Sequence, residues 1–315
     1  ALTDITIPDS VTSIGAYAFL DCSSLESIYI NNEMFSIAGV PWGAENATVY
    51  WNNVPTTYHP YLSINSNGTV KCIDKTITEA VIPEYVNGTK VTSISFSAFD
   101  GCSSLESIYI DKEKDSLDLS NSGIPNTATV YWKNPALSID NNGAVSCIDK
   151  TVTEVVIPPM IDGIMVTSID NEAFSGCSSL SEIKIPNSVT SIGIMAFRHC
   201  TSLTSITIPD SVTSIGVYAF YNCSSLGSIT IPDSVESIGM RAFENCSSLA
   251  SATIGNSVES IGDFTFYDCS SLTSVIIPDS VTSIGESAFY GCSALTDITI
   301  PDSVESIGMR AFENC

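Results

Sequence analysis

The C-terminal part of the chain repeats one order of apolar and polar positions, which is clear in residues 203–225. Leu203, Ile206 and Ile208 are separated by polar residues, and this alternation is typical of a strand with one buried face. Pro209 ends the strand because it has no amide hydrogen to donate, and the Asp-Ser pair after it favours a turn. Each unit is therefore expected to begin with a strand and a turn.

The second part of the unit returns to the interior and then turns back. Val212 and Ile215 predict a further extended segment, which Gly216 ends. Phe220 and Cys223, with the alanine before them, have the spacing of a short helical turn that buries the phenylalanine ring. The predicted coil is a strand, a turn, a second extended segment and a helical turn.

This unit recurs with a period of 23 residues. The marker phenylalanine occurs nine times, at Phe19, Phe99, Phe174, Phe197, Phe220, Phe243, Phe266, Phe289 and Phe312. A unit this short cannot enclose its own core, so the units must bury their apolar faces against one another. The pattern predicts a repeat solenoid, mainly β with short helical turns.

Two related insertions interrupt the regular array, at about residues 31–76 and 111–151. Each contains the sequence ATVYW and a longer shared stretch, LSINSNGTVKCIDKTITEAVIP from Leu62 and LSIDNNGAVSCIDKTVTEVVIP from Leu137. The tyrosine-containing strand just before each insertion and the one inside it lie 21 or 22 residues apart, close to the period of the array. We therefore expect the solenoid to run through them as one domain over residues 1–315, as a fragment of a longer protein.

Local turn signals predict what the insertions add. Asn67-Gly68 and Asn142-Gly143 lie between short alternating runs, which is the strongest short-range signal for a β-hairpin. Residues 83–91 and 158–166 are five residues longer than the equivalent part of a regular unit. An exposed loop is expected at each of these two places.

Charge and hydropathy exclude two classes of partner. The chain of 315 residues carries 35 acidic residues against 11 Lys plus Arg, a formal charge of −24. No basic surface is available to displace the counterions of a phosphate backbone, which excludes nucleic acid. No apolar run approaches the roughly 18–20 residues that cross a bilayer, so no transmembrane segment is expected in this chain.

The eleven cysteines do not indicate a disulfide framework. Nine of them occupy one position of the unit, so in a solenoid they project in parallel about 5 Å apart, the spacing of neighbouring strands. Parallel side chains at that spacing do not meet disulfide geometry without movement of the backbone. These cysteines are predicted to be free thiols that pack as small apolar residues.

The sequence offers no catalytic constellation and no cofactor site. His59 and His199 are its only histidines, they lie in different regions, and both are expected at the surface. No phosphate-binding loop, zinc motif or dinucleotide fingerprint is present. The aspartates of the repeated Pro-Asp-Ser turn could bind calcium, but turn formation explains them equally well, and asparagine replaces them in two units. No catalytic and no metal-binding residues are therefore assigned.

One strand position varies in an informative way. It faces outward between the two inward aliphatic residues, and it is mostly threonine in the C-terminal units. In the N-terminal units the same position holds Tyr29, Tyr50, Tyr109 and Tyr131. Exposed tyrosines on a rigid sheet are what binding surfaces use, because they bury a large area at a low entropic cost. The alternative is that the insertions fold over these rings and make them ordinary core.

The repeated string IPxSVxSIGxxAFxxCSSL resembles the BspA-type leucine-rich repeats of bacterial and protozoan surface proteins. The resemblance covers residues 2–13 and most of the chain from residue 77, whereas the insertions depart from it. It implies a leucine-rich-repeat-like, right-handed array of coils. It also implies an extracellular or cell-surface location, and adhesion is a function of several members of the class.

The favoured hypothesis is thus a non-enzymatic, cell-surface or secreted recognition protein that presents an extended surface to a protein or glycan. A structural spacer that holds another domain away from the cell wall is the alternative. A carbohydrate-active enzyme is a third and remote possibility, since no pair of carboxylates stands out. The tyrosines favour recognition, because a spacer needs only a uniform surface.

Overall fold

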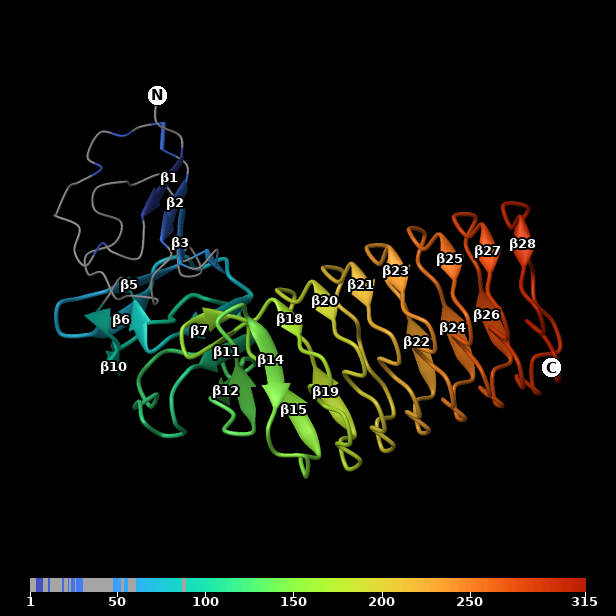
Figure 1. The fold of residues 1–315 in the computed structure, drawn as a ribbon. Helices are drawn as coiled ribbons and strands as arrows, with labels where there is room; N and C mark the ends of the chain where they lie inside the picture. Colours follow the sequence, from blue (N-terminus) through green and yellow to red (C-terminus); the bar gives the residue numbers. More distant parts are fainter. Residues whose placement is uncertain are drawn as a thin grey trace. The chain divides into compact units, whose positions relative to one another are not determined.

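The structure is a computed structural model of residues 1–315, and it is drawn in Figure 1. It describes residues 4–7, 11, 19, 22, 24–25, 27–30, 48–51, 54–55, 61–86 and 89–315. Two compact units are distinguished. The N-terminal unit comprises residues 1–133, 141–143 and 158–165, and the C-terminal unit comprises residues 134–140, 144–157 and 166–315. The expected single domain therefore stays a prediction.

The C-terminal unit is a stack of coils, each of which adds short strands to parallel sheets (Figure 1). The first strand of the coil forms the pair β15-β19 and the sheet β22-β24-β26. The bounds of these strands are β15 Glu154–Val156, β19 Glu182–Lys184, β22 Ser228–Thr230, β24 Ser251–Thr253 and β26 Ser274–Ile276. Partners lie 23 residues apart in β22, β24 and β26, for example Ser228 opposite Ser251.

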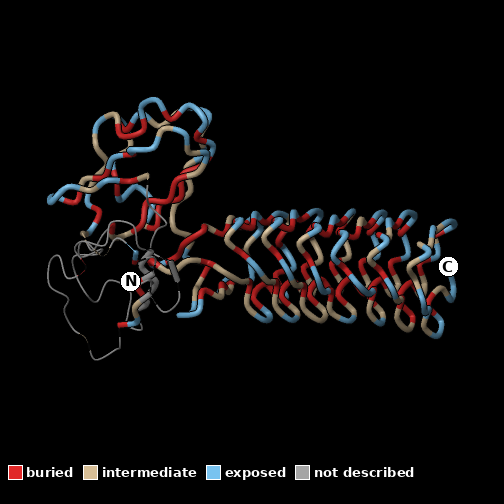
Figure 2. The backbone as a smooth tube through the Cα atoms, turned by 90° about the horizontal axis from the view of Figure 1, so that it is seen from above, coloured by how far each residue is buried: buried red, intermediate tan, exposed pale blue. Residues whose placement is uncertain are grey.

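From residue 168 onward, the second extended segment of each coil forms another row of parallel strands, and the antiparallel hairpin of residues 137–147 is attached at one edge of this row. A six-stranded sheet has the order β13-β14-β18-β20-β21-β23, and a three-stranded sheet has the order β25-β27-β28. The bounds are β13 Leu137–Ile139, β14 Ala144–Cys147, β18 Ser168–Ile169, β20 Ser191–Ile192, β21 Ser214–Ile215, β23 Ser237–Ile238, β25 Ser260–Ile261, β27 Ser283–Ile284 and β28 Ser306–Ile307. This arrangement confirms the repeat solenoid, in which buried and exposed residues alternate along each coil (Figure 2).

The marker phenylalanines form a continuous stack through the C-terminal unit. Phe174, Phe197, Phe220, Phe243, Phe266 and Phe289 are each 0% exposed. Neighbouring rings, continuing to Phe312, have centroids 5.2 to 5.4 Å apart and interplanar angles of 2 to 9°. Because each ring lies between two others, its burial depends on the coils on both sides.

The segment around each phenylalanine differs from the expected helical turn. In the described residues it contains no helix; the Cys223 amide donates to the Phe220 carbonyl at 3.1 Å, while the Phe220 amide donates to Ala242 of the next coil at 2.8 Å. Tyr218 and Asn222 have φ values of 57° and 56°, in the left-handed region that a right-handed helix cannot include. The coil therefore changes direction through two tight bends. Backbone amides of these bends donate hydrogen bonds to carbonyls of the next coil.

The described residues of the N-terminal unit form five small sheets. Their strand orders are β1-β2-β3-β4, β10-β6-β5, β12-β11-β7, β8-β9 and β16-β17. The bounds are β1 Asp4–Ile7, β2 Ser27–Ile30, β3 Thr48–Trp51, β4 Val54–Pro55, β5 Leu62–Ile64, β6 Thr69–Cys72, β7 Glu79–Ile82, β8 Tyr85–Val86, β9 Thr89–Lys90, β10 Ser93–Ile94, β11 Ser107–Ile110, β12 Thr129–Trp132, β16 Met160–Ile161 and β17 Ile164–Met165. Parallel pairs β2–β3 and β11–β12 confirm that the tyrosine strands of each insertion are neighbours.

The insertions contain both predicted hairpins. Strands β5 and β6 pair antiparallel around Asn67-Gly68, and β13 and β14 do so around Asn142-Gly143. The prediction of exposed loops at residues 83–91 and 158–166 is wrong. Both segments form hairpins, β8–β9 and β16–β17, in which Val86, Met160 and Ile161 are buried, with Met160 only 4% exposed, and Tyr85, Ile164 and Met165 are half-buried. The extra length that suggested a loop is used instead for a hairpin, because burial of these side chains stabilises it.

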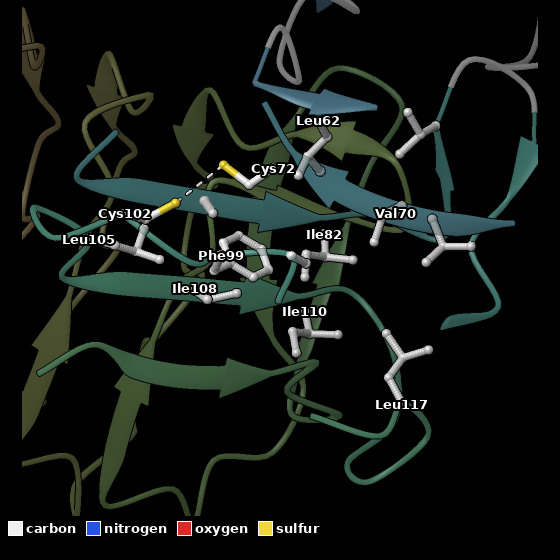
Figure 3. Packing of buried hydrophobic residues seen from close by; sticks show 14 residues of the cluster. Leu62, Val70, Cys72, Ile82, Phe99, Cys102, Leu105, Ile108, Ile110 and Leu117 are labelled. Atoms are coloured by element: carbon white, nitrogen blue, oxygen red, sulfur yellow. Dashed lines mark hydrogen bonds between the residues drawn. The ribbon is translucent and has the colours of Figure 1, made fainter. Parts of the chain in front are cut away.

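A second apolar core lies inside the N-terminal unit (Figure 3). Its centre is Phe99, which is 0% exposed and packs among residues of β6, β7 and β11 such as Val70, Ile82 and Ile108. Leu117 closes the cluster at its edge. The hairpin of the first insertion and the repeat-like strands thus share one core.

The repeat cysteines are free and almost all buried, as the sequence predicts. From Cys200 onward, each repeat thiol donates to the carbonyl of the preceding coil's phenylalanine, for instance Cys223 to Phe197 at 3.1 Å and Cys246 to Phe220 at 3.2 Å. Burial raises the pKa of Cys246 to about 12, so no thiolate forms at neutral pH. The sequence predicted only that the cysteine packs as a small apolar residue. The hydrogen bond to the phenylalanine carbonyl is an additional contact.

We expect the ladder thiols Cys200, Cys223, Cys246, Cys269 and Cys292 to be unreactive in the native protein. Burial excludes the reagent and suppresses the thiolate, which is the reacting species. Titration with a chromogenic disulfide should detect them only after denaturation, whereas Cys315, which is exposed, should react at once. Rapid modification of the five ladder thiols in the folded chain would contradict this burial.

Candidate binding surface

The outward strand position is exposed in the C-terminal unit. Thr207, Thr230 and Thr299 are all exposed, and Ile276 is 59% exposed. The orientation inferred from the alternation is therefore confirmed for this unit. Its surface is uniform, because short β-branched side chains follow one another along the stack.

The four predicted tyrosines lie on neighbouring strands of the N-terminal unit. Tyr29 pairs with Tyr50 across β2 and β3, and Tyr109 pairs with Tyr131 across β11 and β12. The side chains of Tyr29 and Tyr50 lie outside the part of the chain that the structure describes. Tyr109 is only 2% exposed, and Tyr131, half-buried, stacks on it with ring centroids 5.0 Å apart. Within the second pair, the accessible ring is that of Tyr131.

A hairpin, β16–β17, is attached beside this second pair. Asp111 and Lys133 lie two residues beyond Tyr109 and Tyr131, on the same faces of their strands. The Asp111 carboxylate accepts a hydrogen bond from the Gly163 amide at 3.1 Å, and Lys133 forms an ion pair with Asp162. Burial raises the pKa of Asp111, partly opposed by these backbone donors. The hairpin thus contributes to covering the face that carries Tyr109.

A different set of aromatic and basic side chains lines the bends of the C-terminal unit. They occupy the positions immediately before and immediately after the Ala-Phe pair, or the Thr-Phe pair in one coil, with one histidine beside them. All are half-buried, and we call them the turn ridge: Arg198, His199, Tyr218, Tyr221, Arg241, Phe264, Tyr267 and Tyr290. The bends place these side chains because the residue before the alanine takes the left-handed conformation in every coil.

Contacts between neighbouring coils make the turn ridge continuous. His199 meets Tyr221 edge-on at 5.3 Å, and Tyr221 meets Tyr218 at 5.6 Å. Further along, Tyr267 lies 5.7 Å from Phe264 and stacks on Tyr290 at 4.7 Å with an interplanar angle of 4°. Ring-to-ring contacts of this kind fix the side chains before any partner arrives, which lowers the entropic cost of binding.

Arg241 connects the two aromatic groups of the ridge. Its guanidinium lies 4.0 Å from the centroid of Phe264 and 5.8 Å from that of Tyr218. It also donates to Glu244 at 2.8 Å, so the buried carboxylate is paired. A planar guanidinium between aromatic faces is stabilised by cation–π attraction and held in one orientation.

A shallow groove of about 370 Å³ runs beside the ridge across three coils. Its floor is made by the Ser-Ile-Gly triplets of β20, β21 and β23, and Ile194 and Val217 form its rim. Ile194 is 46% exposed, and Met240 of the next coil is 42% exposed. Glycine in these triplets allows neighbouring coils to approach closely, because a Cβ at Gly216 would lie 2.5 Å from the backbone of Gly193.

The turn aspartates and the histidines, which the sequence offered as possible metal or catalytic groups, do not lie together in the part of the chain that the structure describes. The Asp233 carboxylate accepts hydrogen bonds from the Asn256 amide and side chain at 2.8 and 3.1 Å, so it serves the turn of the next coil. His199 contacts Asn222 at 2.9 Å within the turn ridge, and His59 lies outside the described residues. Among the described residues, no group of three His, Cys, Asp or Glu side chains is placed to hold a metal ion.

Variation at the outward strand position alone does not reveal the turn ridge. Two columns of the repeat flank the Ala-Phe pair, and these vary in chemistry from unit to unit while the core positions do not. They hold Tyr218 and Tyr221 in one unit, Arg241 and Glu244 in the next, and Phe264 and Tyr267 in the third. Aromatic and arginine residues concentrated in variable columns of a repeat are the signal that could have identified this surface.

No curated protein matches the sequence. The chain is similar to several solved bacterial leucine-rich repeat proteins. One from Bacteroides ovatus is 24% identical, with 99% of this chain and 85% of that chain covered and a TM-score of 0.47. One from Eubacterium ventriosum is 21% identical, with coverage of 99% and 82% and a TM-score of 0.49. A leucine rich cell surface protein from Faecalibacterium prausnitzii is 24% identical, with coverage of 81% and 84% and a TM-score of 0.37.

The family comparison is decisive for classification. The family described as BspA type leucine rich repeat region matches residues 1–39, 64–127, 146–261 and 190–315. These ranges include the repeated strands and bends and extend into both insertions. The chain therefore belongs to the BspA-type leucine-rich repeat family.

Proposed function

We propose that this chain is a non-enzymatic recognition or adhesion protein of the cell surface or the extracellular space. Its mechanism is contact area on a rigid scaffold, with a protein or glycan as the partner. The observation that carries the proposal is the turn ridge, a continuous ladder of half-exposed aromatic rings and arginines. Tyrosine and arginine are enriched at the energetic centres of protein interfaces.

Two further features support recognition. The groove beside the ridge is of the size of a small ligand pocket and has apolar residues at its rim. The Tyr267 hydroxyl, neutral at physiological pH like that of any tyrosine, can donate a hydrogen bond. Partial burial, and then the nearby Asp268 carboxylate, raise its pKa further. In the described residues no helix is long and apolar enough to cross a membrane. The cell-surface or extracellular location is proposed from the family and from the similarity to a cell surface protein of Faecalibacterium.

The strand-face tyrosines Tyr29, Tyr50, Tyr109 and Tyr131 are proposed as a second, smaller surface. Tyr131 is the member with accessible ring area among the described side chains. Tyr109 contributes by holding the Tyr131 ring in place through its stacking contact. This surface is distinct from the turn ridge in sequence and can be tested separately by Tyr131→Ser.

A structural spacer is the alternative function, and the strand face of the C-terminal unit favours it. Thr207, Thr230 and Thr299 repeat one small side chain along the stack, as a scaffold that only provides length would do. A spacer does not require the variable aromatic columns at the bends. The two functions therefore differ in what they predict for the ridge.

Removal of the ridge rings should abolish binding without unfolding the chain. The variant Tyr221→Ser, Tyr267→Ser, Tyr290→Ser should bind at least about 30-fold more weakly, which corresponds to one interfacial hot spot of ~2 kcal/mol. Binding would be measured on arrays of extracellular-matrix proteins and glycans, with the thermal midpoint as the folding control. The matched control is Thr207→Ser, Thr230→Ser, Ile276→Ser on the strand face, which should bind like the wild type. Equal loss in both variants would refute the assignment of the ridge.

A further inference from the structure

Two cysteines lie outside the repeat ladder, one in each insertion. Cys72 ends β6 and Cys147 ends β14, and each begins the sequence Cys-Ile-Asp-Lys-Thr. Both are buried, at 0% and 3% exposure, but the residues that follow, Ile73 and Ile148, are 58% and 66% exposed. Each buried thiol is therefore followed in the sequence by an exposed residue.

Each of these thiols lies against a repeat cysteine. The Sγ atoms of Cys72 and Cys102 are 3.6 Å apart, with Cys102 donating to Cys72 (Figure 3). Cys147 and Cys177 are likewise interacting neighbours. The thiols of Cys72 and Cys147 also donate to the same kind of acceptor, the carbonyl two residues on, which is Asp74 at 3.0 Å and Asp149 at 3.2 Å. These pairs differ from the ladder thiols of the C-terminal unit, which donate to phenylalanine carbonyls.

The same local structure holds both pairs. The Cys72 amide donates to the Ala98 carbonyl at 3.2 Å, and the Cys147 amide donates to Ala173 at 3.0 Å. Lys75 Nζ also donates to Ala98, at 3.0 Å, and Lys150 Nζ to Ala173, at 2.8 Å.

The aspartate of the shared sequence fixes the bend after each cysteine. Asp74 Oδ1 accepts the amide and hydroxyl hydrogens of Thr76, at 2.9 and 2.7 Å, and Asp149 does the same for Thr151. Two copies with the same hydrogen bonds indicate that the thiol pairs are a defined feature of the insertions.

We propose that Cys72 with Cys102, and Cys147 with Cys177, form two disulfide bonds when the chain meets an external disulfide. In each pair one thiolate attacks a sulfur of that disulfide, forms a mixed disulfide and releases one external thiolate. The second cysteine loses its proton to solvent and attacks the mixed disulfide, which forms the intramolecular bond and releases the second external thiolate. Two protein thiols are oxidised and one small-molecule or oxidoreductase disulfide is reduced.

The cross-links fasten the hairpins to the coils that follow them. In the C-terminal unit β13–β14 forms one edge of the six-stranded sheet, and β14 pairs with β18. In the N-terminal unit β5–β6 pairs with β10 in the same way. Terminal elements of a stacked array have neighbours on one side only, so they open first. A covalent bond at these places holds the edges closed.

The test is to refold the reduced chain in a mixture of oxidised and reduced glutathione, so that burial does not limit access. Free thiols are then alkylated under denaturing conditions, and disulfide-linked peptides are identified by mass spectrometry. Two links are expected, 72 to 102 and 147 to 177, with loss of about four hydrogen atoms from the chain. The other cysteines should be alkylated.

Cysteine variants make the result specific. Cys72→Ser should remove only the first link and Cys147→Ser only the second, while the ladder control Cys223→Ser should retain both. Alkylation of all four cysteines in the oxidised wild-type protein would overturn the proposal. Links between adjacent ladder cysteines, such as Cys200 to Cys223, would also overturn it, because they would show that proximity in the hairpins is not what selects the pairs.

Discussion

Phe243→Ala should lower the free energy of unfolding by about 3–5 kcal/mol, the usual range for truncation of a core phenylalanine. The ring is fully buried and stacks on Phe220 at 5.2 Å and on Phe266 at 5.4 Å. Both stacking contacts and the surrounding apolar contacts are lost together, and the backbone hydrogen bonds of the coil prevent collapse of the cavity. Chemical denaturation followed by circular dichroism measures the change.

The damage should remain local, because each coil of the stack contacts only its neighbours. Amide hydrogen exchange should show lost protection in the coils that contain Phe220, Phe243 and Phe266 and little change in the coil that contains Phe174. A uniform loss of protection across residues 166–315 would contradict a chain of nearest-neighbour contacts. Tyr290→Ala, at the surface of the same unit, is a control and should have a much smaller effect.

Gly239→Ala should destabilise the array by about 1–3 kcal/mol or more, the range for overpacking of a close contact. A Cβ at this position would lie 2.3 Å from the Val217 amide nitrogen and 2.5 Å from the Gly216 carbonyl carbon, atoms of the preceding coil's backbone. Backbone cannot rotate away as a flexible side chain can, so the two coils must separate. The thermal midpoint measures the effect.

Gly227→Ala is the matched control for this substitution. The only atom near its added Cβ is the Thr204 carbonyl oxygen at 3.8 Å, an ordinary contact. Its effect on stability should be within about 1 kcal/mol in either direction, since alanine also restricts the unfolded chain. Equal destabilisation by the two substitutions would show that close coil spacing is not what requires glycine at position 239.

The repeat period alone was sufficient to predict the solenoid, because apolar positions spaced by 23 residues can be buried only by stacking. The Asn-Gly pairs predicted the two hairpins of the insertions for a similarly direct reason, since those residues accept the required turn conformation. The predicted helical turn is absent because backbone conformation depends on which carbonyl accepts the hydrogen bond of each amide. The Phe220 amide bonds the next coil, which no local pattern could indicate.

The surface was harder to predict than the core. Alternation showed which strand residues face outward, and Thr207 and Thr230 confirm it. It could not show that the hairpin at 158–166 would be attached beside Tyr109 and Tyr131, because Gly163 and Asp111 are 52 residues apart. Contacts of this range depend on how the insertions fold, and the repeat period carries no information about them.

Recognition through the turn ridge is tested most directly by a footprint on the bound protein. Oxidative labelling of tyrosine would be compared between the free chain and the chain bound to the matrix protein or glycan that gives the strongest signal on the arrays. The account predicts saturable binding and protection of Tyr221, Tyr267 and Tyr290, with Tyr85 in the N-terminal unit labelled equally in both states. Absence of saturable binding to any component, or binding that leaves the three ridge tyrosines fully labelled, would contradict it.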